Sequence, residues 1–169
     1  MKNVQVPDGM TRLLLADIRG DAPTGTFLLN LNGQMIGWVT DDYERDQLTN
    51  LTTAMAISDY KTILEKLSNG IEAPYLGVRG QEVSTAMEEN GMPAGVYVAD
   101  CIQNGPVYNA GIQNGDVIVK IGEKNILSMK DYENQLEALH QGDTVTVTVQ
   151  RKSVNEYKEL EYQVNVGAR

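Results

Sequence analysis

The side chains best suited to covalent chemistry in this chain are two single residues, His140 and Cys101. Nucleophilic catalysis needs a nucleophile beside a base, and that base is usually histidine. We expect His140 to end a helix, where a cation suits the last carbonyl groups. We expect Cys101 to pack as a small apolar side chain in or just after a strand. The two residues therefore predict no catalytic pair.

Paired carboxylates and metal ligands would offer other chemistry. Asp41-Asp42 and Glu88-Glu89 are adjacent in sequence, so their side chains do not converge on one face as acid–base catalysis requires. The sequence holds no Cys/His spacing typical of a metal site, no glycine-rich phosphate loop and no G-x-S-x-G motif. We therefore expect no metal, no cofactor, and acidic pairs that lie in solvent.

Composition narrows the class of partner. The chain has 169 residues and a net charge of −9. Binding to nucleic acid needs a basic surface that neutralises phosphate, and docking on anionic lipid needs one too. No run of about 18 apolar residues is present that could span a membrane, and no signal peptide opens the chain. We therefore expect protein or peptide partners and no nucleic acid.

The first part of the chain is predicted to form strands followed by one helix. Asn32-Gly33 is a strong hairpin signal, because both central positions of a type I′ turn need positive φ. Ser58 resembles the N-cap of a helix that begins at Asp59. Pro74 favours an extended linker before it, and we place a domain boundary between residues 70 and 71. The expected strands lie at 12–18, 26–31, 34–39 and 53–57.

The second part, residues 71–169, is predicted to be an α+β capped barrel. Ser128 caps a helix over 129–140, and Asp131 completes a motif close to a capping box. A further helix is expected at 83–92 and a short helical turn at 107–111. Strict alternation predicts a half-buried strand at 144–149. The other expected strands lie at 95–98, 116–121 and 160–166, so the fold class is mainly β with α+β.

Two motifs in this second part carry a family resemblance. Pro74-Tyr75-Leu76-Gly77-Val78 is an apolar-Gly-apolar loop that opens a strand, and Ala110–Ile118 reads "AG-hydrophobe-x-x-GD-hydrophobe-I". Together they resemble a PDZ domain of the HtrA serine-protease type. The resemblance implies that residues 71–169 form a short-stranded β-barrel capped by two helices, which binds peptides and does no chemistry.

The first part is similar to the end of a trypsin-like protease domain. Leu28–Gly37 resembles the hairpin that follows the nucleophile in that family, which puts Thr24 at the serine position. The family's His and Asp belong to a first half that this chain does not contain. A threonine methyl crowds the attack, and without a base the hydroxyl is not activated. The resemblance implies that residues 1–70 are a catalytically incomplete part of the barrel and that this chain is no enzyme.

The PDZ resemblance also implies a binding mode, in which a peptide adds a strand to the sheet. The loop Tyr75–Val78 would offer backbone amides to the ligand's terminal carboxylate, and Val78-Arg79-Gly80 would pair with the peptide. Tyr132 and Leu136 either floor the pocket for the last ligand side chain or serve only in the core. The expected ligands are C-terminal or unfolded segments with apolar ends. The candidate peptide-binding residues are Tyr75, Leu76, Gly77, Val78, Arg79, Tyr132 and Leu136.

Three functions are compatible with these features. The preferred one is a peptide-binding PDZ module joined to an inactive protease remnant. The second is the C-terminal fragment of an active HtrA-like serine endopeptidase of protein quality control. The third is self-association, for example as a homodimer, because half a barrel leaves strand edges unpaired. The family resemblance implies a location in the cell envelope or outside the cell, with membrane contact only through an anchor absent from this chain.

Overall fold

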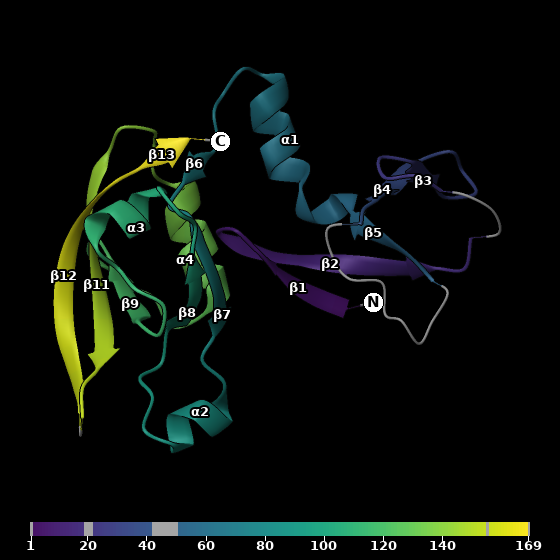
Figure 1. Ribbon diagram of the computed structural model, residues 1–169. Helices are drawn as coiled ribbons and strands as arrows, with labels where there is room; N and C mark the ends of the chain where they lie inside the picture. The colour runs from purple at the N-terminus through teal and green to yellow at the C-terminus, as the bar shows by residue number, and fades with distance from the viewer. Residues whose placement is uncertain (1, 19–21, 42–50, 155, 169) are drawn as a thin grey trace. The chain divides into compact units, whose positions relative to one another are not determined.

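The computed structural model describes residues 2–18, 22–41, 51–154 and 156–168. The chain divides into two compact units. The first unit comprises Met1–Val4 and Thr11–Asn69, and the second comprises Gln5–Met10 and Gly70–Arg169. Figure 1 follows the chain through both units, and strands dominate each of them. The expected fold class, mainly β with α+β, is confirmed.

A five-stranded sheet makes up most of the first unit. The strand order is β1-β2-β5-β4-β3, and β2 with β5, β5 with β4, and β4 with β3 pair antiparallel. A short 3₁₀ turn, η1, and one helix, α1, follow the sheet. The bounds are β1 Lys2–Val6, β2 Gly9–Ala16, β3 Phe27–Leu29, β4 Met35–Val39, β5 Thr52–Ala56, η1 Ile57–Asp59 and α1 Lys61–Ser68.

The predicted hairpin at Asn32-Gly33 forms, but its turn is not of type I′. Gly33 has a φ of 75°, whereas Asn32 is not among the described residues with positive φ. The Asn30 carboxamide oxygen instead accepts hydrogen bonds from the amides of Asn32 (2.9 Å) and Gln34 (3.0 Å). An Asx-type side-chain acceptor thus organises a wider loop than the two-residue turn that we predicted.

The predicted helix start at Ser58 is wrong. Ser58 and Asp59 lie in η1, and α1 begins at Lys61 without a side-chain cap. Both polar side chains bond to Arg12 of β2: the Ser58 hydroxyl accepts from the guanidinium at 2.7 Å, and the Asp59 carboxylate accepts from the Arg12 amide at 2.8 Å. The hydrogen bond from the Arg12 guanidinium also holds the pKa of Asp59 below its usual range. A tertiary partner has therefore taken the residues that would cap the helix.

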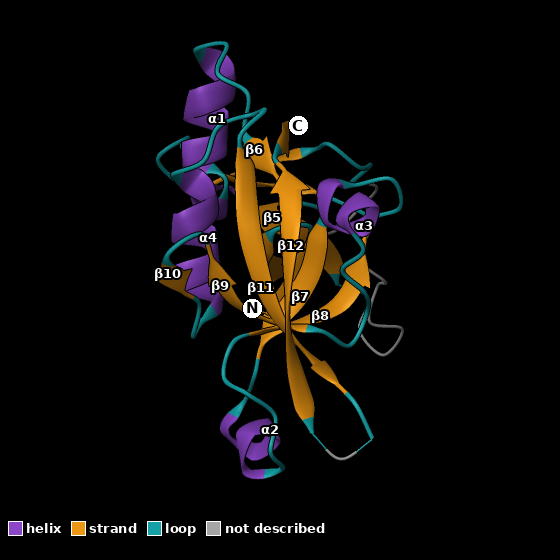
Figure 2. Cartoon of the chain, turned by 90° about the vertical axis from the view of Figure 1, so that its left-hand side faces the viewer, coloured by secondary structure: helices purple, strands orange, loops and turns teal. Residues whose placement is uncertain are grey.

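The second unit is built on a sheet with the order β12-β11-β9-β8-β7, to which β10 adds beside β9. A two-stranded pair, β6 with β13, forms a separate sheet. Figure 2 shows α2 beyond the ends of β7 and β8, away from α3. The bounds are β6 Pro74–Tyr75, β7 Val78–Glu82, α2 Thr85–Glu89, β8 Val96–Cys101, α3 Pro106–Ala110, β9 Val117–Ile121, β10 Lys124–Asn125, α4 Met129–Glu137, β11 Thr144–Lys152, β12 Tyr157–Asn165 and β13 Gly167–Ala168.

One hydrophobic core fills this second unit. It draws fully buried side chains from every strand of the large sheet except β10, and from α3 and α4. The prediction that Cys101 packs as an apolar side chain is confirmed. Burial, with smaller contributions from the charges of Asp100 and Asp116, raises the pKa of the thiol to about 11. The largest fully buried side chains include Tyr132, Leu76, Ile118, Ile121 and Ile126.

The helix α4 starts as predicted and ends early. Ser128 accepts a hydrogen bond from the Asp131 amide, and the Asp131 carboxylate accepts from the Ser128 amide, which completes a capping box. The helix stops at Glu137, so the expected position of His140 in its last turn is wrong. His140 is exposed in the following turn, where its amide donates to Asp143. The acidic pair Glu88-Glu89 is exposed, as expected, whereas Asp42 of the other pair lies outside the described residues.

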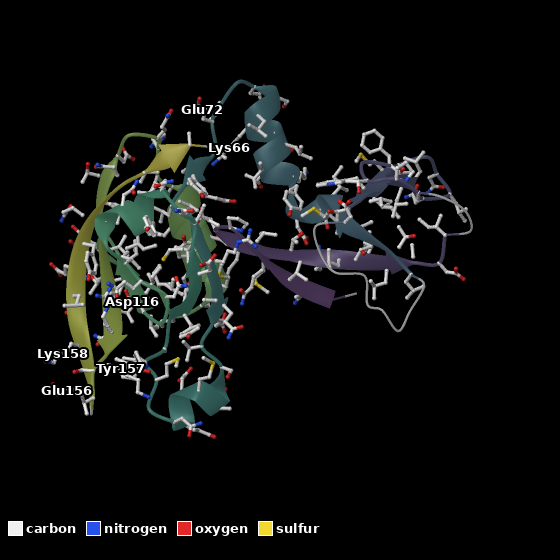
Figure 3. The ribbon with its side chains drawn as sticks, in the orientation of Figure 1. Lys66, Glu72, Asp116, Glu156, Tyr157 and Lys158 are labelled. Carbon is white, nitrogen blue, oxygen red and sulfur yellow. The ribbon has the colours of Figure 1, made fainter. Side chains whose placement is uncertain are left out.

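A buried ion pair ties β11 to the start of β9. Asp116, labelled in Figure 3, has 1 % of its side chain exposed. The Arg151 guanidinium donates to both carboxylate oxygens at 2.7 Å and to the Gly111 carbonyl at 3.1 Å. The bidentate geometry is the strong form of this interaction. It ties the turn of the "AG-hydrophobe-x-x-GD" motif to β11.

Candidate functional site

The loop between β6 and β7 turns its carbonyl groups inward and leaves its amides to face a ligand. The Val107 amide donates to the Leu76 carbonyl at 3.1 Å, and the Ile102 amide donates to the Gly77 carbonyl at 2.9 Å. Gly77 adopts a φ of 87°, and a Cβ there would lie 3.1 Å from the Tyr75 hydroxyl. Successive amides in such a turn form a concavity that binds anions.

A carboxylate from the same chain occupies this concavity. The side chain of Asp8 accepts hydrogen bonds from the amides of Leu76 at 3.0 Å, Gly77 at 2.9 Å and Val78 at 2.9 Å. The Tyr132 hydroxyl of α4 donates to the same carboxylate at 2.7 Å. Three successive amides and one phenol therefore converge on one carboxylate, which is the geometry needed to hold the terminal carboxylate of a peptide.

The residues before Asp8 follow the edge of the sheet. The Asp8 amide donates to the Val78 carbonyl at 2.6 Å, and the Gln5 side chain donates to the side chain of Gln81 at 3.1 Å. The segment therefore runs antiparallel to β7, which is the last strand of its sheet. In Figure 1 the tip of the β1–β2 hairpin lies beside β7 and α4. It lies along the strand edge that a peptide would use in β-augmentation.

The helix α4 contacts the hairpin tip from the other side. The Met10 amide donates to the Glu133 carboxylate at 3.3 Å, and the Met10 side chain packs against the core of the second unit. Gly9 is buried, and a Cβ there would lie 3.2 Å from the same Glu133 oxygen. Asp8 itself has a φ of 59°, a conformation that Asp tolerates better than most residues and that turns the chain away from the loop.

The structure brings most of the predicted site residues together. The amides of Leu76, Gly77 and Val78 and the hydroxyl of Tyr132 all bond to one carboxylate. Leu136 is buried in the same core as Leu76 and Tyr132. Arg79 is exposed on β7, and the Tyr75 side chain lies against Gly77. Their roles toward an external peptide stay predictions.

Sequence reasoning missed the residues that fill the site, above all Asp8 and Met10. A signal for a turn was present, because Pro7-Asp8-Gly9 combines three residues that favour turns. Such a signal predicts that the chain reverses there. It does not say which surface the reversed chain covers, so the contact with the loop at Gly77 required the structure.

The predicted nucleophile position lies in an exposed turn of the first unit. Thr24 is exposed, and the hydroxyl and amide of the neighbouring Thr26 donate to the Pro23 carbonyl at 2.7 and 3.0 Å. The chain's single histidine, His140, belongs to the second unit. Among the described residues, no group of His, Cys, Asp and Glu is arranged to hold a metal ion. The described helices are all too short or too polar to span a bilayer.

Comparison with known proteins defines the class of the second unit. Residues 74–165, more than half of the chain, match the PDZ domain family. This chain belongs to the PDZ domain family. The six-stranded sheet, the loop at Gly77 and the helix α4 are the elements that this match covers.

Curated relatives that match about three quarters of the chain are serine proteases of the Do-like HtrA and DegP-like kinds, which confirms the resemblance inferred from the motifs. The chain is 33 % identical over 142 residues to the serine protease Do-like HtrB of Bacillus subtilis (strain 168), a match that covers 76 % of this chain and 31 % of the relative. It is 30 % identical over 139 residues to a probable periplasmic serine endoprotease DegP-like of Pseudomonas fulva (strain 12-X), covering 76 % and 28 %.

A solved structure shares the fold over most of the chain. The HtrA-type protease AlgW with decapeptide superimposes with a TM-score of 0.55 at 22 % identity, over 86 % of this chain and 45 % of that one. The chain spans about a third of the length of the curated relatives, 31 % and 28 %. The fold is therefore shared, and the activity of the longer relatives is not thereby assigned to this chain.

Proposed function

We propose that the second unit binds C-terminal or extended peptide segments with apolar ends by adding them as a strand to β7. The observation that carries this proposal is the set of three amides, Leu76 to Val78, that already hold a carboxylate at 2.9–3.0 Å. β7 is the last strand of its sheet, so its edge would supply the backbone partners once Gln5–Asp8 has left it, and the PDZ family match supports the assignment. Arg79, exposed on β7, would meet residues upstream in the peptide.

The test is a fluorescence polarisation titration with labelled peptides that end in Val, Leu, Ile or Phe. The protein is the full chain carrying Asp8→Gly. This substitution removes the carboxylate from the three amides, and glycine adopts the positive φ of position 8 without strain. Binding at micromolar strength is expected, since a short peptide must be ordered. Amidation of the peptide's carboxylate removes a charged acceptor and should weaken binding about ten- to hundredfold. Equal binding of free and amidated peptides would contradict the proposal.

A second variant tests the loop itself. Gly77→Ala, added to the Asp8→Gly chain, places a methyl group against the Tyr75 hydroxyl and strains the loop, so we expect peptide binding to be lost. Gly91→Ala is the matched control, because its φ of 84° imposes the same backbone strain with nothing within 4 Å of the new Cβ. Loss of binding in both variants would argue against a specific role of the loop.

We propose that the first unit is a protease remnant without activity of its own, in a protein located outside the cytoplasm. The lack of activity is supported by Thr24, which is exposed and belongs to a unit that contains no histidine. The location is supported by the name of one relative, a probable periplasmic endoprotease. The purified chain should not cleave casein above the level of a Thr24→Ala control. Cleavage that Thr24→Ala abolishes would favour the alternative of an active endopeptidase fragment.

Self-association is a second candidate function, favoured by one observation. Phe27 and Leu29 of the sheet's last strand, β3, are 66 % and 60 % exposed, which is unusual for large apolar side chains at a strand edge. Light scattering after size exclusion should then give a dimer that dissociates on Phe27→Lys. A monomer at all concentrations would exclude this function.

A further inference from the structure

A segment of the same chain, Gln5–Met10, fills the carboxylate site described above and lies along the neighbouring strand edge. Asp8 supplies the carboxylate to the three amides and to Tyr132, and its amide donates to the Val78 carbonyl. Gln5 contacts Gln81 farther along the edge, and Met10 adds an apolar side chain to the core. The same functional groups would be needed from the last residues of a bound peptide.

We propose that Gln5–Asp8 is the resident ligand of this PDZ site and that an external peptide binds only by displacing it. The inference rests on the proposed peptide-binding function and adds its regulation. The Asp8 side chain takes the place of a terminal carboxylate, which an internal segment lacks. The positive φ of Asp8 and the buried Gly9 then let the chain turn away from the loop into β2.

Tethering makes this competition effective. A ligand in the same chain meets its site at an effective concentration that the connection sets and that does not depend on the concentration of the protein. An external peptide can bind only the fraction of molecules in which Gln5–Asp8 has left the site. Its apparent dissociation constant therefore equals the intrinsic constant divided by that fraction. If the tip leaves the site in a tenth of the molecules or fewer, the apparent affinity falls at least tenfold.

The contact is also specific to a carboxylate. Each amide of the loop donates to an Asp8 oxygen, and Gly77 reaches both oxygens at 2.9 Å. Asparagine at position 8 would keep one acceptor oxygen and tolerate the positive φ, but it would place a donor group against one or more amides. Asp8→Asn should therefore release the tip in part, and Asp8→Gly should release it fully.

The experiment compares wild type, Asp8→Asn and Asp8→Gly in the full chain with the labelled peptides described above. We expect the peptide's dissociation constant to fall at least tenfold in Asp8→Gly, with Asp8→Asn between the two. Glu89→Gln removes the same charge from the exposed end of α2 and should match wild type. Tight binding by both wild type and Asp8→Gly, with equal constants, would overturn the displacement while leaving the peptide-binding function intact.

A second readout measures the occupancy without any peptide. Amide hydrogen exchange, followed by NMR, should be at least tenfold faster at Leu76, Gly77 and Val78 in Asp8→Gly than in wild type, while the Val98 amide, bonded to the Asp116 carbonyl, stays unchanged. Unchanged exchange at the three amides would overturn the resident contact. If exchange accelerates and Asp8→Gly binds no peptide, the peptide-binding function fails, and competition for the site fails with it.

Discussion

The two units of this chain use similar strands and bury them to very different degrees. In the second unit, side chains such as Ile118 and Tyr132 are fully buried in one continuous core. In the first unit, the sheet buries Leu13, Val39 and small alanines, while Phe27 on its last strand is 66 % exposed. Alternating apolar residues thus specify a strand in both units, but only the second closes a core around its strands.

The two units also differ in how well their buried polar groups are hydrogen-bonded. Asp116 of the second unit is buried and bonded to Arg151 through both of its oxygens. In the first unit, the hydroxyls of Thr11 and Thr53 are buried with no hydrogen-bond partner within the described part of the chain. Unpaired buried polar groups cost stability. We therefore expect the second unit to hold its structure under conditions that unfold the first.

The largest effect should come from breaking the buried ion pair. Arg151→Ala leaves the buried Asp116 carboxylate without its charged partner, which typically costs about 3–5 kcal/mol. Urea unfolding of the second unit, followed by NMR, should give a free energy of unfolding that is lower by this amount, with the midpoint at a lower urea concentration. Trp38, the chain's single tryptophan, reports the first unit through its fluorescence. A matching shift of the Trp38 transition would mean that the units unfold together, and the contrast would fail.

A matched pair of truncations compares the two units directly. Ile118→Ala removes a fully buried side chain from the second unit and should cost about 2–5 kcal/mol. Leu29→Ala removes a side chain that is 60 % exposed in the first unit and should change stability by about 0.5 kcal/mol or less. Both are measured by urea unfolding. A large loss of stability in Leu29→Ala would mean that Leu29 is buried in solution, and the contrast between the units would fail.

The smallest effect concerns acid. The pKa of Asp59 is lowered by its hydrogen bond with the Arg12 guanidinium, so the pair stabilises the folded state above the unfolded pKa of about 4. This contribution is lost as the pH falls through the folded pKa. The free energy of unfolding of the first unit, followed by Trp38 fluorescence, should fall less steeply from pH 5 to pH 3 in Arg12→Gln than in wild type. Parallel curves would show that the pair adds nothing to the first unit.

Features that depend on neighbouring residues were predictable from the sequence. The alternation Thr144–Val149 gave a strand, although it extends to Lys152, and Ser128 with Asp131 gave a capped helix. Ser58 shows where such reasoning stops. It has the chemistry of a cap, but Arg12, distant in sequence, takes its hydroxyl. A hydrogen bond with a distant partner cannot be read from local spacing.

The candidate site divides in the same way. The loop Tyr75–Val78 was predicted because its motif is local, and the amides of Leu76 to Val78 indeed converge on a carboxylate. The source of that carboxylate, Asp8, was not predicted, because its contacts lie some seventy residues away in the sequence. Only the folded chain shows that the two segments meet.

The burial of Cys101 makes the chain convenient for spectroscopy. With a pKa of about 11, the thiol is ionised in roughly one molecule in ten thousand at neutral pH, and the thiolate is the reactive form. Cys101 is also the only cysteine. A cysteine introduced at Gln5 could therefore carry a spin label or a dye while Cys101 stays unmodified. The departure of the hairpin tip from β7 could then be timed in solution.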